Sequence, residues 1–192
     1  MKKYITLVML VLLTACEQAP APQTLPGVNF SGATPIRLAV AEIRVIDNYR
    51  PKLAAPNVEH QFPLTPSQAI KDWASQRLQA TGGTGILEIT IEDASVVEVP
   101  LPVKEGVRGF FSDDQSQRYD LKLRTVMRAY SGERASADAE GDVNIVRSKS
   151  INEKATIADR EKLFNTMVLE AATIHDREAE ARLRQFFNRF IR

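Results

Sequence analysis

The 192-residue sequence contains one cysteine and two histidines, and this scarcity excludes several kinds of site. One cysteine cannot build a disulfide framework or a zinc site made of several cysteines. The sequence also lacks a G-x-S-x-G nucleophile motif, a phosphate-binding glycine loop and an H-E-x-x-H metal motif. We therefore expect no metal, no cofactor and no enzymatic activity.

The charges nearly balance, with 25 Lys and Arg against 24 Asp and Glu. The basic excess that is typical of nucleic-acid-binding proteins is missing, so we expect no nucleic-acid partner. Long apolar runs are missing as well. The N-terminal run of about eleven apolar residues that follows Lys2 and Lys3 is shorter than the roughly 20 residues of a membrane-spanning helix. A positive start, a short apolar stretch and small residues before position 16 are typical of a secretory signal.

The four residues Leu13-Thr14-Ala15-Cys16 resemble the lipobox of bacterial lipoproteins. In that family the chain is cut before the cysteine, which then receives acyl chains. The resemblance implies that residues 1–15 are removed and that Cys16 anchors the protein in the membrane. The alternative is an ordinary secretory signal in which Cys16 is incidental. Glu17 in place of Asp favours, by the enterobacterial sorting rule, the outer membrane facing the periplasm.

Residues 16–35 contain four prolines and two glycines, a composition that predicts an extended tether. Without Lys2 and Lys3 the 25 positive charges become 23, so the mature chain is near −1. Bulk charge would then not hold it to an anionic surface. We expect a single folded domain over residues 36–192.

The remaining pattern predicts an α+β domain in the order β-α-β-β-β-α, with a mostly antiparallel four-stranded sheet and both helices on one face. The predicted strands cover 36–46, 87–99 and two segments on either side of Gly132. Thr65-Pro66-Ser67-Gln68 predicts a helix start with a capping box, and Ile70, Trp73, Ala74 and Leu78 would share one face of that helix.

The strands on either side of Gly132 are expected to pair as a hairpin. Their inner faces would carry Tyr119, Leu121, Leu123, Thr125, Met127 and Ala129 on one strand and Ala135, Ala137, Ala139, Gly141, Val143 and Ile145 on the other. Both faces must fall on the same side, so paired residue numbers have an even sum. A three-residue loop, Ser131-Gly132-Glu133, would give a sum of 264, with Arg124 opposite Glu140 and Lys122 opposite Asp142. The basic outer row is also compatible with a lipid-headgroup site.

From Ala158 to Phe190 no proline or glycine interrupts the chain. One apolar stripe runs along the predicted helix: Phe164, Val168, Ala172, His175, Ala179, Leu183, Phe186 and Phe190. Such a helix would be about 50 Å long, against about 33 Å for a ten-residue strand. Either it breaks near His175-Asp176, or its end overhangs the sheet.

Two aromatic segments are candidate binding sites for a partner or a lipid. Phe110 and Phe111 lie in a glycine-flanked loop, where they either fold onto the domain or contact a partner. At the C-terminus, Phe186, Phe187 and Phe190 with Arg189 either dock on a membrane or partner, or pack under the sheet edge.

The two histidines are interpreted as structural. His175 lies on the apolar stripe, and His60 follows Glu59 in a loop between prolines. A neighbouring Glu-His pair provides too few ligands for a metal.

The lipobox, tether and element order resemble small envelope lipoproteins, including the auxiliary lipoproteins of lipid-transport ABC systems and the lipopolysaccharide-assembly lipoprotein. This resemblance is one of fold. The run Ala55 to Pro63, with Ala69, Trp73, Arg77-Leu78, Gln115 and Tyr119, resembles an alphaproteobacterial lipoprotein family with no assigned activity. It implies no functional residue besides Cys16.

We hypothesise a non-enzymatic accessory lipoprotein that binds an envelope protein through the Phe110-Phe111 loop and the C-terminal helix. The alternatives are a lipid-binding or lipid-shuttling module, with its ligand between sheet and helices, and a hydrolase that uses His60 and Glu59.

Overall fold

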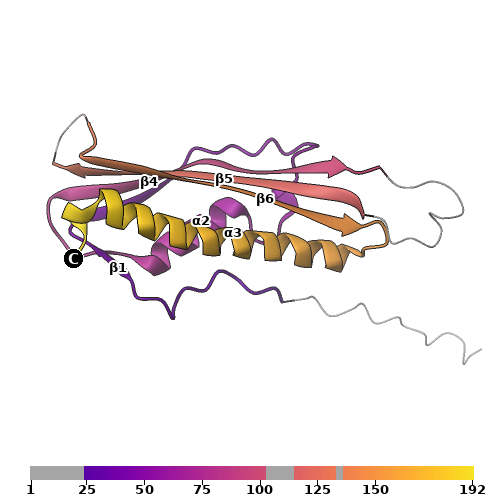
Figure 1. The fold of residues 1–192 in the computed structure, drawn as a ribbon, viewed down its shortest axis with the longest axis horizontal. Coiled ribbons are helices and arrows are strands. Elements are labelled where there is room, and N and C mark those ends of the chain that lie inside the picture. Colours follow the sequence, from indigo (N-terminus) through magenta and orange to yellow (C-terminus); the bar gives the residue numbers. More distant parts are fainter. Residues whose placement is uncertain (1–23, 103–114, 133–135) are drawn as a thin grey trace, which may run out of the picture.

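Three long strands and two helices make up most of the fold in a computed structural model that describes residues 24–102, 115–132 and 136–192 (Figure 1). The elements follow the order β1 (Ile36–Leu38), β2 (Glu42–Asp47), the 3-10 turn η2 (Glu59–Gln61), α2 (Pro66–Arg77), β3 (Leu78–Ala80), β4 (Gly85–Pro100), β5 (Gln115–Ser131), β6 (Ala139–Asn152), α3 (Ile157–Phe186) and the 3-10 turn η4 (Asn188–Phe190).

The main sheet has four strands in the order β2-β4-β5-β6. Strand β2 runs parallel to β4, and the other two pairs are antiparallel. Both helices lie on one side of this sheet, as Figure 1 shows. The predicted α+β class, the mostly antiparallel sheet and the one-sided helices are therefore confirmed.

The strand predicted over 36–46 was wrong as a single element, because the chain changes sheets at residues 39–41. β1 pairs in parallel with β3 in a separate two-stranded sheet, whereas β2 joins the main sheet. Ala39 donates its N–H to the carbonyl of Phe190 (2.6 Å). Strand β1 thus ends at a hydrogen bond to the C-terminal segment. Local strand propensity cannot predict such a contact between distant residues.

In the hairpin the paired residue numbers have an even sum, as predicted, but the register differs from the predicted one. The predicted inner face is buried along β5 and at Gly141, Val143 and Ile145 of β6. Ala137 and Ala139 are half-buried, and Ala135 lies outside the described residues. Paired residues sum to 268. The predicted pairs of Arg124 with Glu140 and of Lys122 with Asp142 were wrong: Arg124 faces Asn144 and Lys122 faces Val146. The Asp138 carboxylate accepts hydrogen bonds from the N–H (2.6 Å) and hydroxyl (2.7 Å) of Ser131, and this contact lengthens the reversal between the strands.

Helix α2 starts as predicted, with the Thr65 hydroxyl accepting from the N–H of Gln68 (3.2 Å). The predicted capping box is only half formed, because the Gln68 side chain donates to Asp72 (2.7 Å) instead. The helix ends at Arg77, so Leu78 is buried as part of β3 and not as part of the helix face.

Helix α3 is one continuous element of 30 residues, about 45 Å long at 1.5 Å per residue. Neither the predicted break near His175-Asp176 nor an overhang occurs. The premise of ten-residue strands was wrong, because β4, β5 and β6 have 16, 17 and 14 residues and span about 46–56 Å. Thr156 and Asp159 form a capping box that fixes the start of the helix.

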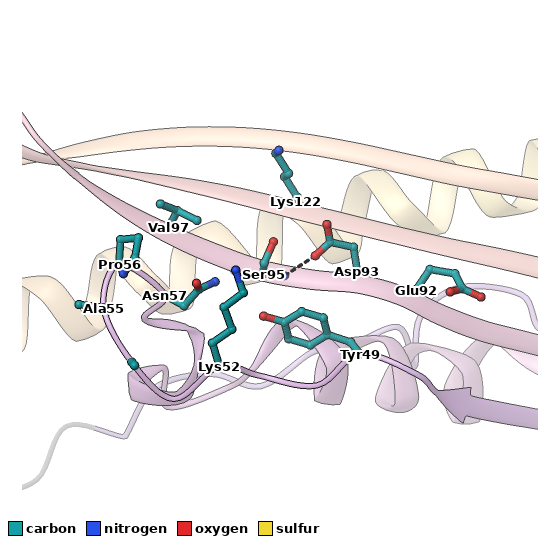
Figure 2. Close-up of a pocket in the computed structure, with 11 residues that line it drawn as sticks. Tyr49, Lys52, Ala55, Pro56, Asn57, Glu92, Asp93, Ser95, Val97 and Lys122 are labelled. Carbon is teal, nitrogen blue, oxygen red and sulfur yellow. Dashed lines mark hydrogen bonds between the residues drawn. The ribbon is translucent and has the colours of Figure 1, made fainter.

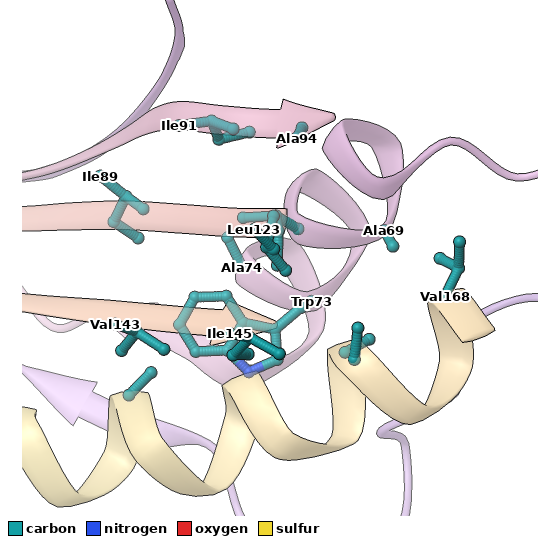
Figure 3. Packing of buried hydrophobic residues seen from close by; sticks show 14 of the residues in the cluster. Ala69, Trp73, Ala74, Ile89, Ile91, Ala94, Leu123, Val143, Ile145 and Val168 are labelled. Atoms are coloured by element: carbon teal, nitrogen blue, oxygen red, sulfur yellow. The ribbon is translucent and has the colours of Figure 1, made fainter. Parts of the chain in front are cut away.

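The core fills the space between the sheet and the helices (Figure 3). Trp73 of α2 is fully buried. Its ring lies edge-on to the ring of His175 of α3, with 4.4 Å between the ring centroids. Figure 3 shows Trp73 surrounded by aliphatic side chains of the inner sheet face, among them Ile89, Leu123 and Val143. The prediction that His175 is a core residue is confirmed.

A partly buried ionic cluster joins the two helices to the segment before β1. Arg77, 3% exposed, pairs through Nε with Asp176 Oδ1 and through Nη2 with Glu180 Oε2, both at 2.6 Å. A third N–H of Arg77 donates to the carbonyl of Thr34, and the Trp73 indole donates to the same Asp176 oxygen (2.8 Å). Every charge in the cluster therefore has a partner.

Residues 26–34 also lie on the helical side of the domain. Asn165 of α3 donates to the carbonyl of Pro26 (3.0 Å), and Gln76 of α2 bonds the carbonyl of Val28 (3.1 Å) and the N–H of Phe30 (2.7 Å). Within the expected tether, the segment from Pro26 onward is thus held against the domain.

Candidate functional site

Three of the sequence-predicted site residues, Cys16, Phe110 and Phe111, lie outside the described residues. Their roles stay predictions. The other four, Phe186, Phe187, Phe190 and Arg189, lie together where α3 ends.

The four C-terminal residues divide between core and surface. Phe187 is fully buried and Phe190 is 8% exposed, so both pack under the sheet edge. Phe186 is 47% exposed, and Arg189 is also exposed. The expectation that Phe186 continues the buried stripe was wrong. The helix ends at this residue, and Phe187 turns inward in its place.

Phe186 lies at one end of a partly exposed strip that follows the free edge of β6. We define the β6 edge strip as Val146, Arg147, Ile174, Arg182 and Phe186. A Cβ atom at Gly141 of β6 would lie 3.5 Å from both the Phe186 ring and Arg182, so these side chains cover the strand there. Val146 is 53% exposed on the same strand.

Two arginines of the strip donate hydrogen bonds to main-chain carbonyls of β6 that point away from β5. Arg182 Nε donates to the carbonyl of Asp142 (3.3 Å), and Arg147 Nη1 donates to the carbonyl of Val146 (3.1 Å). Residues alternate in direction along a strand, so the even-numbered residues of β6 present their N–H and C=O groups outward. Two adjoining hollows, of about 430 and 480 Å³, line this edge against α3 and share Arg147 and Ile174. The edge therefore offers main-chain hydrogen bonding beside apolar and cationic side chains.

A second concave site lies on the opposite part of the sheet, between the 52–57 segment and the outer face of β4 (Figure 2). We call it the β4 cavity; its volume is about 650 Å³. It begins at a bulge in β4, where Ile91 pairs with Thr125 but Asp93 pairs with Arg124. The cavity is lined mainly by Tyr49, Lys52, Asn57, Asp93, Ser95 and Lys122.

Glu59 forms a buried polar contact next to this cavity. It is 3% exposed, and its carboxylate accepts from the Tyr49 hydroxyl (2.6 Å) and from the N–H of Val96 (3.2 Å). Burial, together with the hydrogen bond to Glu59, raises the pKa of Tyr49 above its ordinary range. Tyr49 is thereby kept as a neutral donor that fixes the wall of the cavity.

The two histidines occupy different environments. His60 is exposed and the Glu59 carboxylate is bonded by Tyr49 and by the N–H of Val96, so no hydrogen bond joins the two residues of the hydrolase alternative, which both line a hollow of about 340 Å³. His175 is fully buried; its Nε2 lies 2.9 Å from the Thr125 hydroxyl, and its Nδ1 has no hydrogen-bond partner in the described part of the chain. Burial lowers the pKa of His175 to about 3, against the opposing effect of the Asp176 charge. It is a neutral core residue at neutral pH.

The basic outer row is partly neutralised within the sheet. Arg118 pairs with Asp120 (2.8 Å) and Arg128 with Glu140 (2.9 Å). Within residues 24–102, 115–132 and 136–192, no three His, Cys, Asp or Glu side chains are grouped to hold a metal ion. In the same ranges, no helix is long and apolar enough to cross a bilayer.

Comparison with known proteins gives structural likeness alone. No family model matches the chain, and no curated protein matches it. Among solved structures it is similar to rare lipoprotein B from Shewanella oneidensis (11% identity over 73% of this chain and 93% of that one, TM-score 0.38). It is also similar to an uncharacterized lipoprotein B from Nitrosomonas europaea (14%, 80% and 93%, TM-score 0.41) and to a minor lipoprotein from Acinetobacter baumannii (11%, 80% and 96%, TM-score 0.38).

Proposed function

We propose that the protein is a non-enzymatic accessory lipoprotein of the bacterial envelope, which binds another envelope protein along the β6 edge strip. Cys16 would anchor it in the outer membrane, with the domain facing the periplasm. The lipobox resemblance of Leu13-Thr14-Ala15-Cys16 supports the anchor. The observation that supports binding is the free edge of β6, a 14-residue strand whose outward carbonyls at Asp142 and Val146 are met by arginine side chains.

An extended segment of a partner protein fits the chemistry of this strip. Its main chain would pair with the outward groups of β6, as in strand addition to an exposed sheet edge. Displacing Arg147 and Arg182 from their carbonyls frees two guanidinium groups for acidic side chains of the partner. Phe186 and Ile174 of α3 on the covered side of the edge, and Val146 on the uncovered side, provide apolar contacts for the alternating side chains of an added strand.

The C-terminal residues have separate tasks in this proposal. Phe186 and Arg189 face the partner, whereas Phe187 and Phe190 anchor the end of α3 in the core. The loop with Phe110 and Phe111 is a further contact in the proposal.

The alternative of a lipid shuttle requires space between the sheet and the helices. That layer is occupied by side chains less than 2% exposed, among them Trp73, Leu123 and Met167. A lipid there would have to displace core side chains packed at the density of an organic crystal. This filled core favours surface binding.

Photocrosslinking tests the proposal. A photoreactive phenylalanine analogue replaces Val146 or Phe186 in the full chain, expressed in its own envelope, and a third chain carries it at Ile157, which is 79% exposed. We expect positions 146 and 186 to crosslink the same envelope protein and position 157 to give no such adduct. Crosslinks at all three positions, or at none, would contradict the proposal.

A proline variant distinguishes strand addition from general stickiness. Asn144 lies between Asp142 and Val146, so its N–H points outward and makes no ladder bond with β5. Asn144→Pro should remove the crosslink at 146 and leave the fold intact, because proline is tolerated on edge strands. Asn144→Ala is the matched control and should keep the crosslink. Mass spectrometry of the N-terminal peptide tests acylation of Cys16 in the same preparation.

A further inference from the structure

The β4 cavity is lined by Asn57, a residue almost completely buried whose side-chain amide faces the cavity and has no hydrogen-bond partner among the described residues. Asn57 is 4% exposed; its N–H bonds the carbonyl of Ala54 (2.9 Å), and its neighbours Pro56 and Val58 form the main-chain bonds of its bridge to Val97. In the described part of the chain its side-chain amide makes no hydrogen bond. The amide lines the cavity, and Figure 2 shows it beside Lys52 and Ser95. The amide atoms themselves are open to the cavity, so their two donors and one acceptor are available to a ligand that enters it.

Charges of both signs surround this amide. Lys52, from the 52–57 segment, and Lys122, from β5, provide two ammonium groups. Glu92 and Asp93 at the β4 bulge provide two carboxylates. One Asp93 oxygen accepts from the N–H of Ser95 (3.0 Å), which fixes that carboxylate at the wall of the cavity. A ligand that matches the cavity therefore carries both a positive and a negative group.

The remaining wall is apolar. Ala55, Pro56 and Val97 line the end of the cavity away from Glu92, as Figure 2 shows. An asparagine amide both donates and accepts, which matches the N–H and C=O of a peptide group. Small side chains of a peptide would contact Ala55, Pro56 and Val97 while its termini meet the charged groups.

We propose that the β4 cavity binds a short zwitterionic peptide. Asn57 pairs with a peptide group, Lys52 and Lys122 hold its carboxylate, and Asp93 and Glu92 hold its ammonium group. A cavity of about 650 Å³ has the size of small-molecule sites in proteins. The motif from Ala55 to Pro63 builds this site: it places Asn57 in the wall and Glu59 behind Tyr49. The site lies on the β4 side of the sheet, away from the β6 edge strip, so each proposal stands or fails without the other.

Nuclear magnetic resonance of the full mature chain, solubilised with its anchor in detergent, tests this site with trialanine as the probe. The side-chain amide signals of Asn57, assigned by their loss in Asn57→Ala, should shift and saturate as trialanine is added. In Asn57→Ala, where binding is followed through the main-chain amide of Ser95, trialanine should bind about tenfold more weakly, the loss expected for one hydrogen-bonding group. Lys52→Ala should weaken binding about threefold or more. The fold should persist in Asn57→Ala, because the N–H bond of residue 57 and the main-chain bonds of Pro56 and Val58 to β4 remain.

Three controls make the test decisive. Asn144→Ala, an exposed asparagine on β6, should leave trialanine binding unchanged. Trialanine acetylated at its amine and amidated at its carboxyl should bind about tenfold more weakly, because both charges are lost. Non-saturating shifts into the millimolar range, equal binding by folded Asn57→Ala, or equal binding of the neutral disaccharide chitobiose would each overturn the assignment.

Discussion

The two faces of the four-stranded sheet contribute differently to stability and to binding. On the helix-covered face, Leu123 and its neighbours are almost fully buried against Trp73 and α3. On the other face, charged residues form a ladder across all four strands: Arg44 lies opposite Glu88, Glu88 opposite Arg128, and Arg128 opposite Glu140. Apolar burial contributes far more free energy than exposed charge pairs. The covered face therefore determines stability, and the uncovered face and its edge are available for binding.

The largest effect should come from the covered face. Trp73→Ala removes a fully buried ring and its hydrogen bond to Asp176, so we expect a loss of about 3–5 kcal/mol in the free energy of unfolding. Urea denaturation at pH 7 measures this loss. A loss below about 1 kcal/mol would show that the layer between sheet and helices is less closely packed than described.

Substitution of Arg77 tests how much the ionic cluster between the two helices contributes to the free energy of unfolding. Arg77→Met leaves Asp176 without its cation, while Glu180 keeps Arg184 (2.6 Å), and breaking a buried pair costs about 3 kcal/mol or more. Because Asp176 and Glu180 are 18% and 31% exposed, water relieves part of this cost, and we expect about 2–3 kcal/mol by urea denaturation. The triple variant Arg77→Met/Asp176→Asn/Glu180→Gln should recover stability. If it is no more stable than the single variant, the loss is one of packing.

His175 predicts a pH dependence of stability. Its pKa in the folded state is about 3, against about 6.5 in the unfolded chain, so below pH 6.5 the unfolded state takes up a proton that the folded state does not. The contribution of His175 to the free energy of unfolding is present above pH 6.5 and is lost as the pH falls toward 3. Between pH 7 and 4.5 we expect this residue to account for about 2–3 kcal/mol of destabilisation.

The measurement for His175 is the change in unfolding free energy between those two pH values. In His175→Asn this change should be smaller by about 2–3 kcal/mol, even though the variant is less stable overall. His60→Asn is the matched control, because His60 is exposed and should leave the change as it is. An equal change in the wild type and His175→Asn would contradict the burial of a neutral imidazole.

The smallest effect should come from the uncovered face. Arg128 and Glu140, whose side chains are 33% and 57% exposed, form a pair worth about 0.2–1 kcal/mol. Arg128→Ala should lower stability by no more than this, and added salt should reduce the difference. A double-mutant cycle with Glu140→Ala isolates the pair, and a coupling of several kcal/mol would remove the contrast between the two faces.

The sequence predicted the covered face well, because alternation of apolar residues directly records burial on a strand. The predictions failed for features that depend on contacts between residues far apart in the sequence. The hairpin register depends on Asp138 reaching Ser131, and β1 ends at a hydrogen bond to Phe190, 151 positions after Ala39. The helical stripe included Phe186 because periodicity does not reveal where a helix ends. Phe187 follows it and turns into the core.

The candidate sites were less predictable than the fold. The β6 edge strip combines side chains of β6 and α3, and the β4 cavity combines residues 49–57 with β4 and β5, so neither is continuous in sequence. The run from Ala55 to Pro63 was the available signal for the cavity. It marked the segment but did not show that the Asn57 amide would face the cavity.

Hydrogen exchange of single amides in β6 tests most directly whether the uncovered edge binds a partner. The amides of Asn144 and Val146 point outward, and those of Val143 and Ile145 point toward β5. In the purified protein the outward pair should exchange rapidly and the inward pair slowly. In native envelope membranes the outward pair should become as protected as the inward pair. Unchanged rapid exchange of Asn144 and Val146 in those membranes would contradict binding at the β6 edge strip.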